Sequence, residues 1–157
     1  MGYMYKSLLK SLITIFSISL VCLGSLEDVN GQSLILDSLN TELLKTKNDS
    51  KKVKLLVEKA SILVISNPVE ARGFAQDALV LAGKSEMAYD SAIAYHQIGR
   101  TYYAQGEFDM ALETENKALA LSLSLPDSIA FSATCYNGLA IYLNSLGQAD
   151  SALELHS

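Results

Sequence analysis

The sequence repeats itself at a regular interval, which limits the chain to folds built from a recurring unit. The segment GEFDMAL at 106–112 returns as GQADSAL at 147–153, with its glycine, alanine and leucine in the same places. The interval from Gly106 to Gly147 is therefore the period of the repeat. A similar pattern lies about one period upstream, where Asn67-Pro68 replaces the glycine turn. The chain thus contains three copies of one unit, of which the last is incomplete.

Each copy predicts a hairpin of two helices. Apolar and small residues fall at helical spacing on both sides of a turn, as they do around Gly106. Small side chains let two helices approach closely, while larger ones fill the space beside them. The residues expected to pack the hairpins together are Gly99, Tyr102, Ala111, Ala118, Ala140 and Ala152.

These residues and the equivalent residues of the other copies resemble the tetratricopeptide repeat, whose usual period is about 34 residues. The longer period here resembles the extended repeats in the N-terminal sensor regions of bacterial signalling proteins of the histidine kinase or cyclase type. Glu115 departs from the family pattern, which usually has a large apolar or aromatic residue there, and Leu143 stands where the family prefers tyrosine. The resemblance implies an all-α, right-handed α-solenoid of helical hairpins.

We expect three parts along the chain: a signal peptide at 1–31, a capping helix at 32–48 and the repeat array at 49–157. The hairpins of the array are expected at about 50–84, 85–125 and 126–157. The leucines at 36, 39, 43 and 44 form the apolar stripe of the capping helix, which should cover the first hairpin. A natural array ends in a polar cap, so the apolar ending at Ser157 predicts a truncated chain with more repeats beyond it.

Residues with a preference for helix ends mark the boundaries between these helices. Asn48 begins a triplet that offers capping oxygens, although the same triplet also matches a glycosylation acceptor. Pro68 suits the first position of a helix. We expect Gly83 to be a left-handed cap and Asp127 to cap the helix that follows it.

The stretch 1–31 has the pattern of an exported leader. Lys6 and Lys10 are followed by an uncharged run at 11–26, which is shorter than the roughly 20 residues that cross a bilayer. Cleavage after Gly31 is favoured, with Gly24 as a second choice, and the residue before Cys22 argues against a lipoprotein signal. The leader predicts export to the periplasm or cell envelope, and an uncleaved leader would attach the chain to the membrane.

The charge and the composition disfavour several classes of function. The chain has 12 basic and 17 acidic residues and a net charge of −5, which argues against a nucleic-acid partner. Neither a G-x-S-x-G elbow nor a glycine-rich phosphate loop is present. We therefore expect no catalytic residue, no cofactor and no enzymatic activity.

A metal site is also not expected from the ligand count. The histidines His96 and His156 lie far apart in the sequence, and after export Cys135 would be the only cysteine, so no ligand pair has the spacing of a zinc site. Cys135 is interpreted as a buried structural thiol. Glu115, with Glu113 and Asp109, is interpreted as part of a solvated outer face rather than as a carboxylate cluster.

A binding groove is the remaining candidate site. The resemblance implies that the first helix of each hairpin lines a concave face that holds protein or peptide ligands. The groove residues expected on the central and last hairpins are His96, Arg100, Tyr103, Asn137, Ile141 and Asn144. Arginine and asparagine can hold a peptide backbone or a carboxylate, and tyrosine adds flat apolar area. The alternative is that these are ordinary surface residues and that His96 packs against the neighbouring hairpin.

Two functions remain open. The first is the extracytoplasmic sensory or scaffolding part of a bacterial signalling protein, in which ligand recognition shifts the hairpin packing. The second is a free-standing periplasmic scaffold for envelope protein assembly. A further apolar run of about 20 residues downstream would favour the first, because it would span a membrane.

Overall fold

The structure is a computed structural model, and it describes residues 31–147. The predicted signal peptide before Gly31, the end of the third hairpin and Ala152 lie outside the described residues. Within 31–147 the chain is helical and contains no strand, as the repeat pattern predicted. A first helix covers 31–45, and the others are α2 (Asp49–Leu63), α3 (Pro68–Lys84), α4 (Ala88–Ala104), α5 (Phe108–Leu123) and α6 (Ile129–Ser145).

The chain divides into two compact units, one up to Asn40 and one from Thr41 onward. In the first unit the described residues are helical. In the second unit Leu43 packs against the core of the first hairpin, and Glu42 forms an ion pair of 2.6 Å with Lys51. Leu44 is 88% exposed, so the predicted apolar stripe is wrong at this residue.

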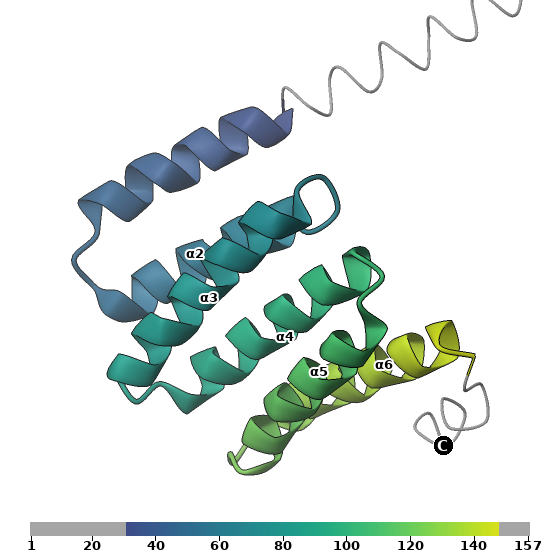
Figure 1. The fold of residues 1–157 in the computed structure, drawn as a ribbon. Helices are drawn as coiled ribbons and strands as arrows, with labels where there is room; N and C mark the ends of the chain where they lie inside the picture. The colour runs from purple at the N-terminus through teal and green to yellow at the C-terminus, as the bar shows by residue number, and fades with distance from the viewer. Residues whose placement is uncertain (1–30, 148–157) are drawn as a thin grey trace, which may run out of the picture. The chain divides into compact units, whose positions relative to one another are not determined.

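The helices of the second unit pair in the order of the sequence. Figure 1 shows α2 beside α3 and α4 beside α5, and each helix contacts the next along the chain. The first helices of successive hairpins also touch, since α2 contacts α4 and α4 contacts α6. This second set of contacts places α2, α4 and α6 next to one another, which is what a stack of hairpins requires.

The repeat is visible in the backbone itself. Helix α4 runs from Ala88 to Ala104 and α6 from Ile129 to Ser145, so both ends of α6 lie one sequence period after those of α4. The turns that follow these helices are made by Gly106 and Gly147, whose φ angles are 76° and 77°. Glycine adopts this left-handed conformation without the steric cost that a side chain brings. The two glycines therefore set the same helix end in both copies.

The predicted helix boundaries are confirmed at the starts of α2 and α3. The Asn48 side chain accepts a hydrogen bond of 2.8 Å from the backbone N–H of Lys51, and Asn67 caps α3 in the same way. Pro68 is the first residue of α3, where its missing N–H costs nothing.

The predictions for Gly83 and Asp127 are wrong. Helix α3 continues through Gly83 to Lys84, and the left-handed residue of that turn is Glu86, with a φ of 56°. Asp127 is itself left-handed, with a φ of 61°, and the helix after it is preceded by Ser128. A short polar side chain tolerates this conformation, so Asp127 makes the turn rather than the cap.

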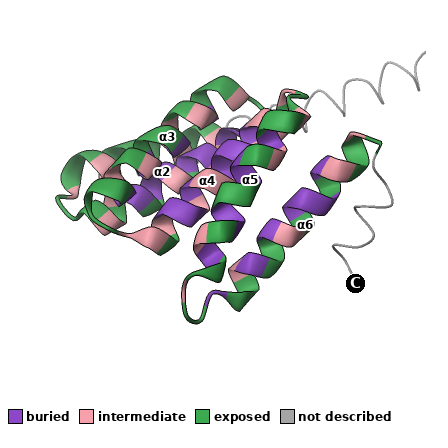
Figure 2. Cartoon of the chain, turned by 60° about the horizontal axis from the view of Figure 1, so that its bottom comes forward, coloured by how far each residue is buried: buried purple, intermediate pink, exposed green. Residues whose placement is uncertain are grey.

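Alanines are fully buried on the helix faces that pack together. Ala75 and Ala78 on α3, and Ala111 and Ala118 on α5, are all fully buried. In Figure 2 the buried residues of α4 and α5 gather where the two helices meet. Larger side chains complete three hydrophobic clusters, which include Val53 and Leu56, Ile98 and Tyr102, and Leu119 and Leu139. Small and large residues thus alternate in the core as the hairpin pattern requires.

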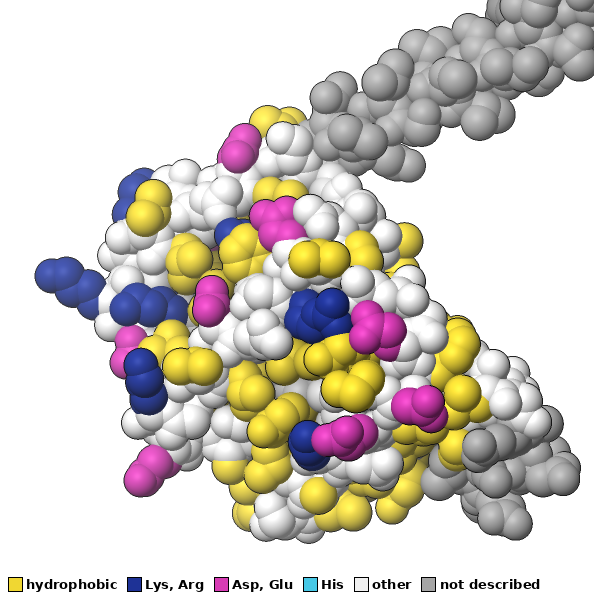
Figure 3. Space-filling view, viewed as in Figure 1, with side chains coloured by type: hydrophobic (Ala, Val, Ile, Leu, Met, Phe, Trp, Pro, Cys, Tyr) yellow, Lys and Arg dark blue, Asp and Glu magenta, His cyan; other side chains and the backbone are white. Residues whose placement is uncertain are grey.

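The outer surface mixes charge with apolar area. On the face shown in Figure 3, lysine and arginine side chains are interspersed with aspartate and glutamate rather than gathered into one basic patch. None of the helices in residues 31–147 is both long and apolar enough to cross a membrane.

Candidate functional site

The groove residues predicted from the sequence line one cavity. His96, Arg100 and Tyr103 on α4 and Asn137 and Ile141 on α6 all contribute to its wall, and its volume is about 320 Å³. We call it the α4–α6 cavity. Asn144, the sixth predicted residue, does not line it. The remaining lining residues are Val64, Ile65, Ala104, Thr134, Gly138 and Tyr142.

Arg100 provides the positive charge of the α4–α6 cavity. Its Nη1 donates to the Ser61 hydroxyl at 3.3 Å and to the Gln97 side-chain oxygen at 3.1 Å. Both acceptors are neutral, and within residues 31–147 Arg100 forms no ion pair with a carboxylate. A guanidinium held in this way retains donors for a planar anion such as a carboxylate.

Aromatic side chains form another part of the wall. The rings of Tyr103 and Tyr142 stack with centroids 4.9 Å apart and planes at 26°, and the Ser145 hydroxyl donates to the Tyr103 oxygen at 3.3 Å. Tyr142 is buried, and burial raises the pKa of its phenol. The stacked pair gives the cavity a rigid flat surface suited to an apolar or aromatic group.

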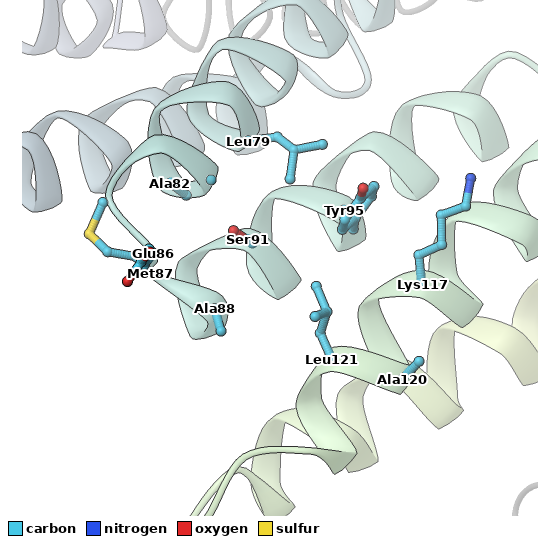
Figure 4. A pocket seen from close by; sticks show the side chains of 11 residues that line it. Leu79, Ala82, Glu86, Met87, Ala88, Ser91, Tyr95, Lys117, Ala120 and Leu121 are labelled. Atoms are coloured by element: carbon cyan, nitrogen blue, oxygen red, sulfur yellow. The ribbon is translucent and has the colours of Figure 1, made fainter.

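A second cavity, of about 710 Å³, lies among α3, α4 and α5. Leu79, Tyr95 and Leu121 extend toward the same space from these three helices (Figure 4). Its one basic side chain, Lys117, is already paired with Glu113 at 2.7 Å. The smaller α4–α6 cavity is therefore the better candidate for specific binding, because more polar groups converge on it.

Glu115 contradicts the interpretation of α5 as a solvated acidic face. Glu113 is exposed, but Glu115 is 0% exposed and is among the largest fully buried side chains. The signal for this was present in the sequence. Glu115 lies four positions after Ala111 and three before Ala118, so it shares their helix face and points into the packed interior.

Two glycines make the space that Glu115 occupies. A Cβ on Gly99 would lie 3.0 Å from the Glu115 Oε2. A Cβ on Gly138 would lie 3.0 Å from the Glu115 Cδ and 3.1 Å from its Oε1. The carboxylate thus lies between α4 and α6, and a Cβ on either glycine would make an unusually close contact with it.

His96 and Cys135 surround the same carboxylate. Nδ1 of His96 lies 2.7 Å from Oε1 of Glu115, while Oε2 has no hydrogen-bond partner among the described residues. Burial, together with the Glu115 charge, raises the pKa of the Cys135 thiol to about 12. The expectation of a buried cysteine is confirmed, since Cys135 is fully buried. It belongs to the hydrophobic cluster of Leu119 and Leu139, and the polar atoms of His96 and Glu115 also lie near its sulfur.

The ligand count in the sequence did not reveal this cluster. The ligand atoms of His96, Glu115 and Cys135 all lie within 4.8 Å of one another. Each residue comes from a different helix, so no short sequence spacing connects them. Only the stacking of α4, α5 and α6 brings them together.

Two segments of the chain match the tetratricopeptide repeat family. They cover residues 91–123 and 132–156, and their starting residues are offset by the same period that separates Gly106 from Gly147. The first matched segment covers most of the α4–α5 pair in Figure 1, and the second includes most of α6. Tetratricopeptide repeats generally act in protein interaction, and the segments place the α4–α6 cavity between two of them.

Solved structures of proteins with tetratricopeptide or similar repeats have a similar fold. The tetratricopeptide repeat domain of Arabidopsis FLU has 17% sequence identity and a TM-score of 0.62, and the match covers 69% of this chain and 92% of that one. A putative kinesin light chain with nearly identical repeats from Podosopora anserina has 17% identity and a TM-score of 0.64. That match covers 82% of this chain and 65% of the other, less than two thirds of its length. At this identity the likeness shows a shared fold alone. No curated protein sequence matches the chain.

Proposed function

We propose that the chain binds an extended protein segment through the α4–α6 cavity, and that Arg100 anchors a carboxylate of that segment. The observation that supports this is the cavity itself, where residues from equivalent positions of two repeats surround a guanidinium with neutral partners. A volume of about 320 Å³ suits one or two side chains of a ligand rather than a whole folded domain.

The parts of the cavity would divide the recognition between them. Arg100 supplies charge and paired donors for a carboxylate, Asn137 can bond a peptide group, and the Tyr103–Tyr142 pair offers an apolar platform. A ligand with an acidic residue next to an apolar one fits this arrangement. The Arg100 charge also slows the escape of such a ligand once it is desolvated.

A peptide library tests the proposal. A phage-displayed library of random dodecapeptides would be selected on the full chain, and the enriched peptides measured by titration calorimetry. We expect enrichment of acidic residues, and a loss of at least about 10-fold in affinity for Arg100→Ala, the cost of one charge-assisted hydrogen bond. Arg100→Lys should recover part of the affinity, since it keeps the charge without the fork geometry.

The matched control is Lys117→Ala. It removes the same charge from α5 at the other cavity, so it should leave the affinity of the selected peptides unchanged. Peptides that bind Arg100→Ala as tightly as the parent protein would refute the assignment of the cavity. Equal urea unfolding midpoints for the two variants would exclude loss of the fold as the cause.

We further propose that the chain is exported and acts in the periplasm or cell envelope. The support is the leader pattern, with Lys6 and Lys10 before the uncharged run at 11–26. A fusion of residues 1–40 to alkaline phosphatase should be active in a bacterial host, and N-terminal sequencing of the processed product should begin at Gln32. Activity that does not depend on the leader would contradict export.

Within the envelope, we favour the sensory or scaffolding part of a signalling protein, with a free-standing scaffold as the alternative. The support is the resemblance of the extended repeat period to such sensor regions. Sequencing the DNA downstream of the Ser157 codon distinguishes the two. A further apolar run of about 20 residues followed by a kinase or cyclase favours the sensor, and a polar capping helix followed by a stop codon favours the scaffold.

A further inference from the structure

We infer that His96, Glu115 and Cys135 form a binding site for a single divalent transition-metal ion of the Zn²⁺ class. The three side chains come from α4, α5 and α6, and their ligand atoms all lie within 4.8 Å of one another. This inference goes beyond the binding of a protein segment and does not depend on it. It concerns the buried layer behind the α4–α6 cavity rather than the cavity itself.

The separation of the ligand atoms suits a tetrahedral ion. Zn²⁺ binds sulfur at about 2.3 Å and nitrogen or oxygen at about 2.0–2.2 Å, which places ligand atoms about 3.4–3.6 Å from one another. Nδ1 of His96 is 2.7 Å from Oε1 of Glu115, and no ligand atom of the three is more than 4.8 Å from another. Movements on the order of 1 Å would therefore complete the geometry.

The environment of Glu115 provides an independent reason for a cation. Its side chain is 0% exposed, and Oε2 has no hydrogen-bond partner in the described part of the chain. A buried carboxylate oxygen without a partner is costly, and buried charges are normally paired or bound to a metal. The helices nonetheless leave space for this side chain through Gly99 and Gly138. A bound ion gives the unpartnered oxygen a function.

The charges of the cluster would balance. A Glu115 carboxylate and a Cys135 thiolate carry two negative charges, which one divalent ion neutralises while His96 binds as a neutral imidazole. The Cys135 thiol proton passes to the solvent when sulfur binds the ion. Without an ion the thiol stays protonated, since burial and the carboxylate raise its pKa to about 12, and a metal reverses that preference.

The type of ligand selects the metal. A set of one thiolate, one imidazole and one carboxylate is intermediate in softness, which suits Zn²⁺ and its analogue Co²⁺. Mg²⁺ and Ca²⁺ require oxygen ligands and would not bind here. Three protein ligands leave a fourth position for a water molecule or a ligand group. His96 also lines the α4–α6 cavity, which gives the ion a path into the site.

Cobalt binding tests the site directly. The full chain carrying Cys22→Ser would be purified without an affinity tag, treated with a chelator, and titrated with Co²⁺ under reducing, oxygen-free conditions. Cys135 is then the only thiol, because the sequence has two cysteines. We expect one Co²⁺ per chain, with a near-ultraviolet thiolate-to-cobalt band and the visible bands of a tetrahedral ion. Zn²⁺ should displace the Co²⁺ and abolish these bands.

Variants identify the ligands. Cys135→Ser should abolish the near-ultraviolet band, and Glu115→Gln and His96→Asn should each weaken binding by at least about 10-fold, the smallest effect expected even for residues outside the ligand set. His156→Asn is the matched control, because it removes the only other histidine and should change nothing. Saturating Co²⁺ without a thiolate band in the parent protein would overturn the inference. That result is obtained with the parent protein alone, so a variant that fails to fold cannot affect it.

Discussion

Nδ1 of His96 lies 2.7 Å from Oε1 of Glu115, and these two side chains are 13% and 0% exposed. The contact joins α4 to α5, the two helices of one tetratricopeptide-like hairpin. Gly138 of α6 lies against the same Glu115 side chain. Glu115 is central to the packing of three helices, although it is a charged residue at a position where an apolar one would pack more simply. The stability of this region should therefore depend on its hydrogen-bond partner.

His96→Ala should strongly destabilise the chain. The substitution removes the His96 hydrogen bond from a carboxylate that stays buried, and breaking a buried pair in this way costs about 3–5 kcal/mol. Urea unfolding of the chelator-treated protein measures the loss. In a Glu115→Gln background the same substitution should cost less, because an amide is cheaper to leave unpaired than a carboxylate.

The control for this cycle is Lys117→Ala, which breaks the exposed pair with Glu113 on the same helix. Hydrogen bonding within that pair lowers the pKa of Glu113 and raises the pKa of Lys117, but both side chains face solvent. Its unfolding midpoint should stay close to that of the parent protein. Equal losses for His96→Ala and Lys117→Ala would show that burial of the first pair is energetically irrelevant.

Gly138→Ala should destabilise the chain although alanine is the better helix former. The added Cβ would lie 3.0 Å from the Glu115 Cδ, and that side chain is enclosed on its other side by Gly99. Gly73→Ala is a matched control in α3, where a Cβ meets nothing within 4 Å. Gly73→Ala should raise the free energy of unfolding by about 0.5–1 kcal/mol. Thermal unfolding of both variants measures the change in stability, which should be negative for Gly138→Ala and positive for Gly73→Ala.

The origin of the Gly138 effect can be isolated with a second substitution. In a Glu115→Ala background the contact disappears, so Gly138→Ala should then become neutral or stabilising, as Gly73→Ala is. A loss of stability that persists in this background would place the clash elsewhere than at Glu115.

The fold could be predicted from the sequence because the repeat encodes it directly. Ala111 and Ala118 are small where helices touch, and Gly106 is a glycine where φ is positive, so each choice of residue reports a local constraint. The misplaced helix ends have a different cause. Glu86 adopts the left-handed conformation although its residue type does not favour it, whereas aspartate suits both a turn and a helix cap, so the sequence left the role of Asp127 open.

One candidate site could be predicted from the sequence and the other could not. The cavity residues share one helix face, and the repeat brought His96 and Asn137, which are one period apart, onto one wall. The cluster around Glu115 has one ligand from each of three helices, and no linear spacing encodes that arrangement. Glu115 shares a helix face with Ala111 and Ala118, and this position indicated burial. Its charge led instead to the prediction that it faces solvent, and the tertiary packing overrode that preference.

Asn48→Ala should weaken the start of α2. The Asn48 side chain accepts a hydrogen bond from the Lys51 N–H at 2.8 Å, and losing such a cap costs about 1 kcal/mol. Asn48→Asp should restore the stability, because aspartate accepts the same bond and its charge favours a helix N-terminus. Denaturant unfolding of the three proteins is the measurement. Equal stability of the alanine and aspartate variants would show that the bond contributes nothing in solution.

Cys135 should remain protonated at a pH where an exposed thiol ionises. Burial and the nearby Glu115 raise its folded pKa from 9.0 to about 12, so the folded chain keeps a proton that the unfolded chain loses. The thiol's contribution to stability is therefore complete below about pH 9 and is lost as the pH rises toward 12. In the Cys22→Ser protein with chelator, thiolate absorbance at about pH 10 should appear only after unfolding in urea. Thiolate absorbance in the folded, chelated protein at that pH would contradict the burial of this group, whereas its appearance on addition of Zn²⁺ is the result expected of a metal ligand.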